Sequence, residues 1–158
     1  MKRFITIIFA FFIVSISAQE EAFQKFYNSN KDKSTFSINL STSMAGSFLD
    51  DEDKKDLMLL IKKSSNFKLM VFDNSDNNVA SNFKKFTRRN KIKTLARVKD
   101  DGGKAEFFIK EKKNYITEII VRANSKEDKL VLFGLKTKIT KDELAEIFSS
   151  SDIKFSSK

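Results

Sequence analysis

The sequence predicts an α+β fold, with a mixed, largely antiparallel six-stranded sheet and helices packed mainly on one face. The first observation is in residues 91–139, where four apolar-rich runs are separated by three polar turns, as in an antiparallel meander. The second is the preceding half of the chain, where two strand-like runs are each followed by helix-like runs. The third is the length of 158 residues, which suits one domain around one core.

The N-terminal segment, residues 1–18, has the pattern of a secretory signal peptide. Lys2 and Arg3 precede a run of apolar residues at 4–14 that one threonine interrupts, and small residues follow up to Ala18. The run is too short to span a membrane as a helix. We therefore expect cleavage near Ala18, after Ser17 or Ala18, and a periplasmic or secreted protein with no membrane span left.

The first predicted elements after this segment are a helix, a strand and two further helices. Residues 19–30 have helical spacing of apolar side chains, and residues 35–41 alternate apolar with polar ones. A helix then starts at Ser41 or Ser43, and Asp50 caps the next. The apolar positions expected to face the core in these elements are Ala22, Phe23, Phe26, Tyr27, Phe36, Ile38, Leu40, Met44, Phe48, Leu49, Leu57, Leu60 and Ile61.

The middle of the chain predicts a central strand and an amphipathic helix. Residues 67–73 are apolar on both faces, which favours a strand inside the sheet. Residues 77–90 predict a helix with Val79, Phe83 and Phe86 turned inward. Its outer side carries Lys84, Lys85, Arg88 and Arg89.

The meander supplies four strands, at residues 94–99, 105–112, 115–123 and 130–139, and a helix follows it. The Gly-rich residues 100–103 predict a hairpin loop. Thr140 and Glu143 have the spacing of a capping box, which opens a last helix with Leu144, Ile147 and Phe148 inward. We expect residues 19–150 to form a single domain and residues 151–158 to form a flexible Ser/Lys tail.

The composition excludes several kinds of chemistry. With no His and no Cys, the chain has no Ser–His or Cys–His pair, no tetrahedral zinc site, no disulfide and no lipid attached to cysteine. A Ser–Lys pair stays open, although no spacing singles one out. The acids Asp50, Asp51, Glu52 and Asp53 are interpreted as a helix start rather than a cation site. We expect no cofactor, no metal and no catalytic residue.

Two acidic residues of the meander, Glu106 and Glu118, are the candidates for a carboxylate pair of the kind that hydrolyses glycosides. They fall on neighbouring predicted strands. Each also has a basic neighbour across the predicted hairpin, Arg122 for Glu106 and Lys110 for Glu118. Solvated cross-strand ion pairs are therefore the favoured interpretation.

The chain is basic, with a formal net charge of +9. Nucleic acid is an unexpected partner for an exported protein, so the charge favours solubility or attraction to an anionic envelope component. Lys84, Lys85, Arg88 and Arg89 could contact such an anion. The alternative is an ordinary solvated helix face.

The meander is apolar on both faces. Its more apolar side, expected to face inward, holds Phe107, Ile109, Tyr115, Ile119, Val121, Val131, Phe133 and Leu135. The opposite face still holds Phe108, Ile116, Ile120, Leu130 and Leu132 among charges. Either another element covers that face, with the N-terminal helix as the local candidate, or it is a protein contact face used for self-association or partner binding.

The order of these features resembles a family of exported bacterial proteins, mainly from the Bacteroidota, called domain of unknown function 4252. The matching stretches are FSINLSTSMAGSFL, DDEDKKDLMLLIKKSSNFKLMVFD, TLARVKDDGGKAEFFIKEKKNYITEIIVRA and LVLFGLKTKITKDELAEI, which together span residues 20–150 as one domain. The resemblance implies a small exported domain, similar to an envelope or signalling accessory rather than an enzyme, and it carries no site residues.

The functional hypothesis is an exported, non-catalytic binding or accessory module of the bacterial cell envelope. Its partner would be a protein or an anionic envelope component. The alternative is a hydrolase with an unrecognised carboxylate or Ser–Lys site. The sequence does not indicate an oligomeric state.

Overall fold

The computed structural model describes residues 21–45, 47, 59–73, 77–100, 103–125 and 128–150. Three sequence predictions lie outside these residues: the signal peptide at 1–18, the capping acids Asp50 to Asp53, and the tail at 151–158. Phe48, Leu49 and Leu57 also lie outside them.

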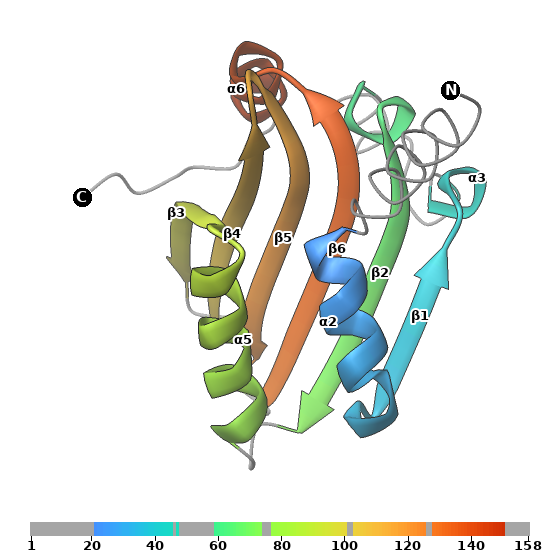
Figure 1. Cartoon of the computed structure of the whole chain (residues 1–158), viewed down its shortest axis with the longest axis vertical. Helices are drawn as coiled ribbons and strands as arrows, with labels where there is room; N and C mark the ends of the chain where they lie inside the picture. Colours follow the sequence, from blue (N-terminus) through green and yellow to red (C-terminus); the bar gives the residue numbers. More distant parts are fainter. Residues whose placement is uncertain are drawn as a thin grey trace, which may run out of the picture.

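The described elements follow the predicted order, and the α+β fold class is confirmed (Figure 1). They are α2 (Ala22–Asn30), η1 (Lys31–Lys33), β1 (Phe36–Leu40), α3 (Thr42–Ala45), β2 (Ser64–Asp73), α5 (Asn77–Arg89), β3 (Lys93–Asp100), β4 (Gly103–Lys112), β5 (Tyr115–Ser125), β6 (Lys129–Ile139) and α6 (Lys141–Ser150). Residues 59–62 are also helical.

The six strands form one sheet in the order β1-β2-β6-β5-β4-β3. All pairings among these described strands are antiparallel. The predicted meander is present as β3 to β6, and β2 lies inside the sheet between β1 and β6, as its apolar sequence predicts. The helix α5 carries the chain from β2 to β3, which is an edge strand.

Two hydrophobic cores lie on opposite faces of the sheet, because neighbouring residues of a strand point to opposite sides. The first core packs α2 and α5 on one face, with Ile120 and Phe108 from the strands. The second core packs α6 on the other face, with Ile119 and Ile109. Figure 1 shows α2 and α5 side by side over one face and α6 at one end of the strands. The helices α2 and α5 therefore share one face, while α6 packs on the other.

Local sequence signals explain the helix ends near these cores. The predicted capping box at α6 is confirmed, since the Glu143 N–H donates to Thr140 Oγ1 at 3.2 Å and the Thr140 N–H donates to Glu143 Oε2 at 2.8 Å. The helix α5 ends at Arg89, and the chain turns away at Lys91, whose φ of 54° is left-handed, where the Ile92 N–H donates back to the Thr87 carbonyl at 2.9 Å.

Candidate functional site

The predicted contact face of the meander is buried inside the protein. Phe108, Ile116, Ile120, Leu130 and Leu132 are each at most 8% exposed. All but Ile116 belong to the first core, beneath α2 and α5. The contact-face hypothesis for these residues is therefore wrong, and the alternative is correct: the N-terminal helix covers the face, together with α5.

Ile116 lies in the second core because a bulge interrupts the alternation of β5. The register between β5 and β6 shifts between residues 116 and 118, so Ile116 pairs with Ile139 and Glu118 pairs with Lys136. A bulge adds a residue to one strand and reverses which side the following residues face. Sequence alternation alone therefore assigned Ile116 to the wrong side.

Aromatic rings fill the space between the helices and this face. Phe26 of α2 meets Phe83 of α5 edge-to-face, with ring centroids 5.6 Å apart, and Phe83 meets Phe108 of the sheet at 5.4 Å. Phe86 lies 4.8 Å from Phe26. The helical spacing of apolar residues predicted that Phe26, Phe83 and Phe86 point inward. Together these rings bury the meander face that the alternation of the strands did not assign to core or surface.

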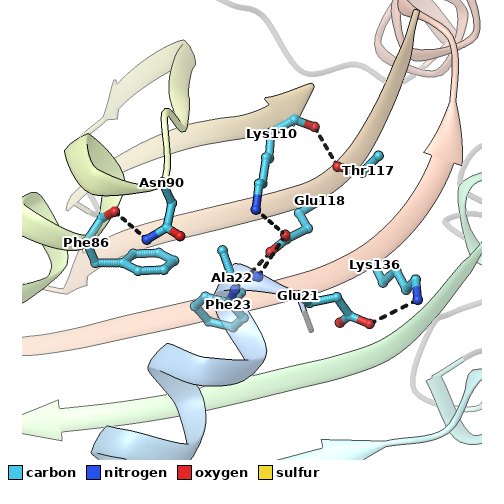
Figure 2. A network of polar contacts seen from close by, with 9 residues as sticks. All are labelled: Glu21, Ala22, Phe23, Phe86, Asn90, Lys110, Thr117, Glu118 and Lys136. Carbon is cyan, nitrogen blue, oxygen red and sulfur yellow. Dashed lines mark hydrogen bonds and ion pairs between the residues drawn. The ribbon is translucent and has the colours of Figure 1, made fainter. Parts of the chain in front are cut away.

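The N-terminus of α2 rests on a buried carboxylate (Figure 2). The two oxygens of Glu118 accept hydrogen bonds from the Ala22 and Phe23 N–H groups, both at 2.9 Å, and Glu118 also pairs with Lys110 at 3.3 Å. Glu118 is only 3% exposed. The predicted ion pair with Lys110 is present, but its carboxylate is buried rather than solvated, because α2 covers Glu118. Glu118 acts as the cap that fixes α2 on the sheet.

A second polar group lies beside this cap. The buried Lys68 ammonium donates to the Asn66 carbonyl at 3.2 Å, and Glu21 accepts from the Asn66 amide at 2.9 Å and pairs with Lys136 at 3.3 Å. Burial lowers the pKa of Lys68, although the charges of Glu21 and Glu118 act against this shift. The sequence pattern alone did not identify Lys68 as a buried residue. The signal that could have identified it is a lysine in the middle of an apolar interior strand.

Glu106 is surrounded by three basic side chains. Arg97 lies at 3.0 Å, Lys104 at 3.1 Å and Arg122 at 3.6 Å from its carboxylate oxygens. Burial acts to raise the pKa of Glu106, but the hydrogen bond and charge of Lys104, with those of Arg122 and Arg97, outweigh burial and lower it. The predicted cross-strand pair with Arg122 is present, although Glu106 is buried rather than solvated.

Glu106 and Glu118 do not form a catalytic carboxylate pair. Glu106 lies opposite Arg122, which is four residues along β5 from Glu118. That offset corresponds to about 13 Å along a strand, which exceeds the separation of roughly 5–9.5 Å that glycoside hydrolysis uses. Both carboxylates bind basic or backbone groups of the protein itself. Among the residues that the structure describes, no acidic cluster could hold a metal ion.

The predicted anion-contact residues lie on the outer side of α5. Lys84, Lys85, Arg88 and Arg89 are all exposed. None of them forms an ion pair with another described residue. Arg88 and Arg89 occupy the last turn of the helix, where positive charge also favours the helix dipole.

The surface that stands out lies on the face opposite α2 and α5, and we call it the open sheet face. It consists of two rows of directly paired residues, each crossing all six strands in sheet order. The first row is Phe36, Val71, Val131, Ala123, Ala105 and Val98. The second row is Ile38, Leu69, Phe133, Val121, Phe107 and Ala96.

Every residue of the open sheet face is apolar, and none of them is fully buried. Phe36 is 51% exposed, and the others are partly exposed. The helix α6 reaches only the border of the face, where the Phe148 ring meets Phe107 at 6.2 Å. An apolar surface that crosses a whole sheet is typical of an interaction site.

Half of the meander residues that were expected to face the core therefore lie in the open sheet face. Ile109, Ile119 and Leu135 are at most 5% exposed in the second core with α6. Phe107, Val121, Val131 and Phe133 stay partly exposed, although Phe133 packs against the edge of that core, and Tyr115 is 41% exposed. On this side of the described part of the chain, α6 packs against the second core together with Ala45, Leu59 and Leu60.

Comparison with known proteins gives one match. No curated protein and no solved structure matches the chain. No helix of the described residues combines the length and hydropathy that crossing a membrane requires. The model of the family described as Domain of unknown function (DUF4252) matches residues 26–147, which is most of the chain and covers the sheet from β1 to β6. The chain therefore belongs to the DUF4252 family.

Proposed function

We propose that this protein is an exported, non-catalytic binding module of the bacterial cell envelope, and that it holds a protein partner on the open sheet face. The observation that carries the proposal is the pair of apolar rows that cross all six strands without a charged residue. Export is supported by the signal-like pattern of residues 1–18.

The distribution of polar groups also supports a binding role. Of the most buried charged side chains, Glu118 accepts hydrogen bonds from the first N–H groups of α2, and Lys68 lies over the Tyr27 ring of the same helix, 6.0 Å from its centroid. Glu106 is enclosed by the cations that neutralise it. These carboxylates and amines serve the fold, whereas the open sheet face has no fully buried residue, although Phe133 packs against the second core.

Photocrosslinking in the native host tests the proposal, because the edge strands offer a matched pair of positions. Phe36 lies in the open sheet face on β1 and is 51% exposed, while Leu95 lies outside the face on β3 and is 40% exposed. A benzophenone amino acid at each position probes its immediate surroundings in the cell envelope. We expect a discrete protein adduct from position 36 and none from position 95. Equal labelling at both positions, or no adduct at either, contradicts the proposal.

A further inference from the structure

Building on the proposed function, we infer that the partner of the open sheet face is a second copy of this chain. Two copies would meet face to face, with the two open sheet faces stacked and the α2 and α5 layers on the outside. Two twisted sheets pack in this way about 10 Å apart, with their inner side chains interdigitated.

The charges of the molecule favour this partner over an anionic one. The basic residues Lys84, Lys85, Arg88 and Arg89 lie on α5, which packs on the other face of the sheet. In a face-to-face pair, two sheets and two helix layers would keep these clusters on the order of 30 Å apart. That distance exceeds the screening length of about 8 Å at physiological ionic strength. The basic cluster on α5 therefore does not oppose association through this face.

The charged groups beyond the two ends of the open sheet face carry both signs. At the α6 end, Glu111 pairs with Lys93 at 2.7 Å and with Lys141 at 3.0 Å. At the other end, Asp73 lies opposite Lys129 in the register of β2 and β6. An anionic surface would be drawn to the cations of α5, whereas a second copy would meet an apolar face whose ends carry charges of both signs.

The sizes of the side chains indicate how the two copies would be oriented. Large residues, Phe36 and Ile38, lie at the β1 edge of the open sheet face, and small ones, Ala96 and Val98, lie at the β3 edge. A two-fold axis that lies between the sheets and runs along the strands places β1 of one copy over β3 of the other. Large side chains then meet small ones at both edges. An axis across the strands would instead stack β1 on β1 and leave the small residues facing each other.

The area of the open sheet face indicates how tightly two copies should bind each other. Six strands about 4.8 Å apart and two rows, each about 7 Å deep, cover on the order of 350 Å² per copy. Stable interfaces bury roughly 800 Å² per partner. We therefore expect a weak dimer, with a dissociation constant in the micromolar range.

Sedimentation equilibrium over a range from low micromolar to several hundred micromolar tests the inference. The full chain is expressed with its N-terminal segment, so that the host processes it as it normally would. We expect a reversible monomer–dimer equilibrium. Phe36→Glu should raise the dissociation constant at least about tenfold, because it places a charge in an apolar interface. The matched control Leu95→Glu should leave it unchanged, and circular dichroism verifies that both variants are folded.

Crosslinking then tests the orientation, because the natural chain has no cysteine. A short bis-maleimide should join two copies of the double variant Phe36→Cys/Val98→Cys but not two copies of Phe36→Cys alone. A wild-type chain that stays monomeric throughout the range overturns the inference, as does a dimer that Phe36→Glu leaves intact or that Leu95→Glu also disrupts. Crosslinking of Phe36→Cys alone overturns the strand-parallel axis. A monomer whose position 36 photocrosslinks to a different protein overturns the second copy as partner while leaving the proposed function standing.

Discussion

The ring of Phe23 occupies the space that a side chain on Gly134 would need. A Cβ placed on Gly134 would lie 2.8 Å from Phe23 Cγ and closer still to two other ring carbons. Real Cβ atoms do not approach ring atoms so closely, so the helix α2 can settle on β6 only because residue 134 is glycine. The contact links the first core to the backbone of the central strand.

Gly134→Ala should therefore destabilise the protein by about 1–3 kcal/mol, the range for an overpacked core. Urea unfolding followed by circular dichroism measures the effect. Asn39→Ala, at an exposed position of β1, is the control and should change stability by less than about 0.5 kcal/mol. Adding Phe23→Leu to Gly134→Ala should cost less than the sum of the two single changes, since the two sites share one space. Strict additivity would show that the ring is not what excludes the side chain.

Glu118→Gln should loosen α2, because one carboxylate oxygen that accepts a backbone N–H becomes an amide group that cannot accept it. We expect a loss of about 1–3 kcal/mol in unfolding free energy, and faster hydrogen exchange in α2 than in α5. Glu146→Gln, on the exposed side of α6, is the matched control. Equal effects of the two substitutions would mean that Glu118 does not cap α2.

The lowered pKa of Glu106 predicts acid sensitivity. Because the folded state holds this carboxylate below its ordinary value of 4.5, its contribution to stability is present above that pH and is lost as the pH falls through the folded value. The unfolding free energy should therefore decline below about pH 4.5, and the decline should be shallower in Glu106→Gln. A profile that is identical in the variant and the natural protein would count against the Arg97, Lys104 and Arg122 contacts.

Lys68 predicts the opposite behaviour at alkaline pH. Burial lowers its pKa from 10.5 in the folded state, so at high pH the unfolded chain binds more protons than the folded one. Stability relative to a Lys68→Met variant should then rise as the pH increases toward 10.5. At neutral pH, Lys68→Met should be neutral or stabilising, since an apolar side chain avoids the cost of a buried ammonium. Thermal unfolding of both proteins from pH 7 to pH 10 measures the difference, and a gap that stays constant over that range would contradict this account.

Much of the fold was predictable from local signals. Alternation located the strands, helical spacing located Phe23, Phe26 and Phe83, and the Thr140–Glu143 spacing predicted the cap of α6. These features depend on residues close together in the chain, so one sequence is enough to recognise them.

Local signals did not predict which face of the sheet the helices α2 and α5 cover. Both faces of the meander are apolar, and which one a helix covers depends on packing between distant segments, such as α2 against β5 and β6. The bulge before Glu118 also moved Ile116 to the second core, and no residue pattern marks that bulge. For the same reason, the buried roles of Glu118 and Lys68 became apparent only once α2 was placed.

The most direct measurement of the central claim, that the open sheet face is uncovered and used for binding, is the alkylation rate of single cysteines in a chain that naturally has none. Ala123→Cys lies in the open sheet face, Asn39→Cys is an exposed reference, and Ala22→Cys, at a site only 2% exposed, is a buried one. We predict that Ala123→Cys reacts with a maleimide nearly as fast as Asn39→Cys in dilute protein, and progressively slower as the protein concentration rises. A rate as slow as that of Ala22→Cys at the lowest concentration would contradict the account, because another part of the chain would then cover the face.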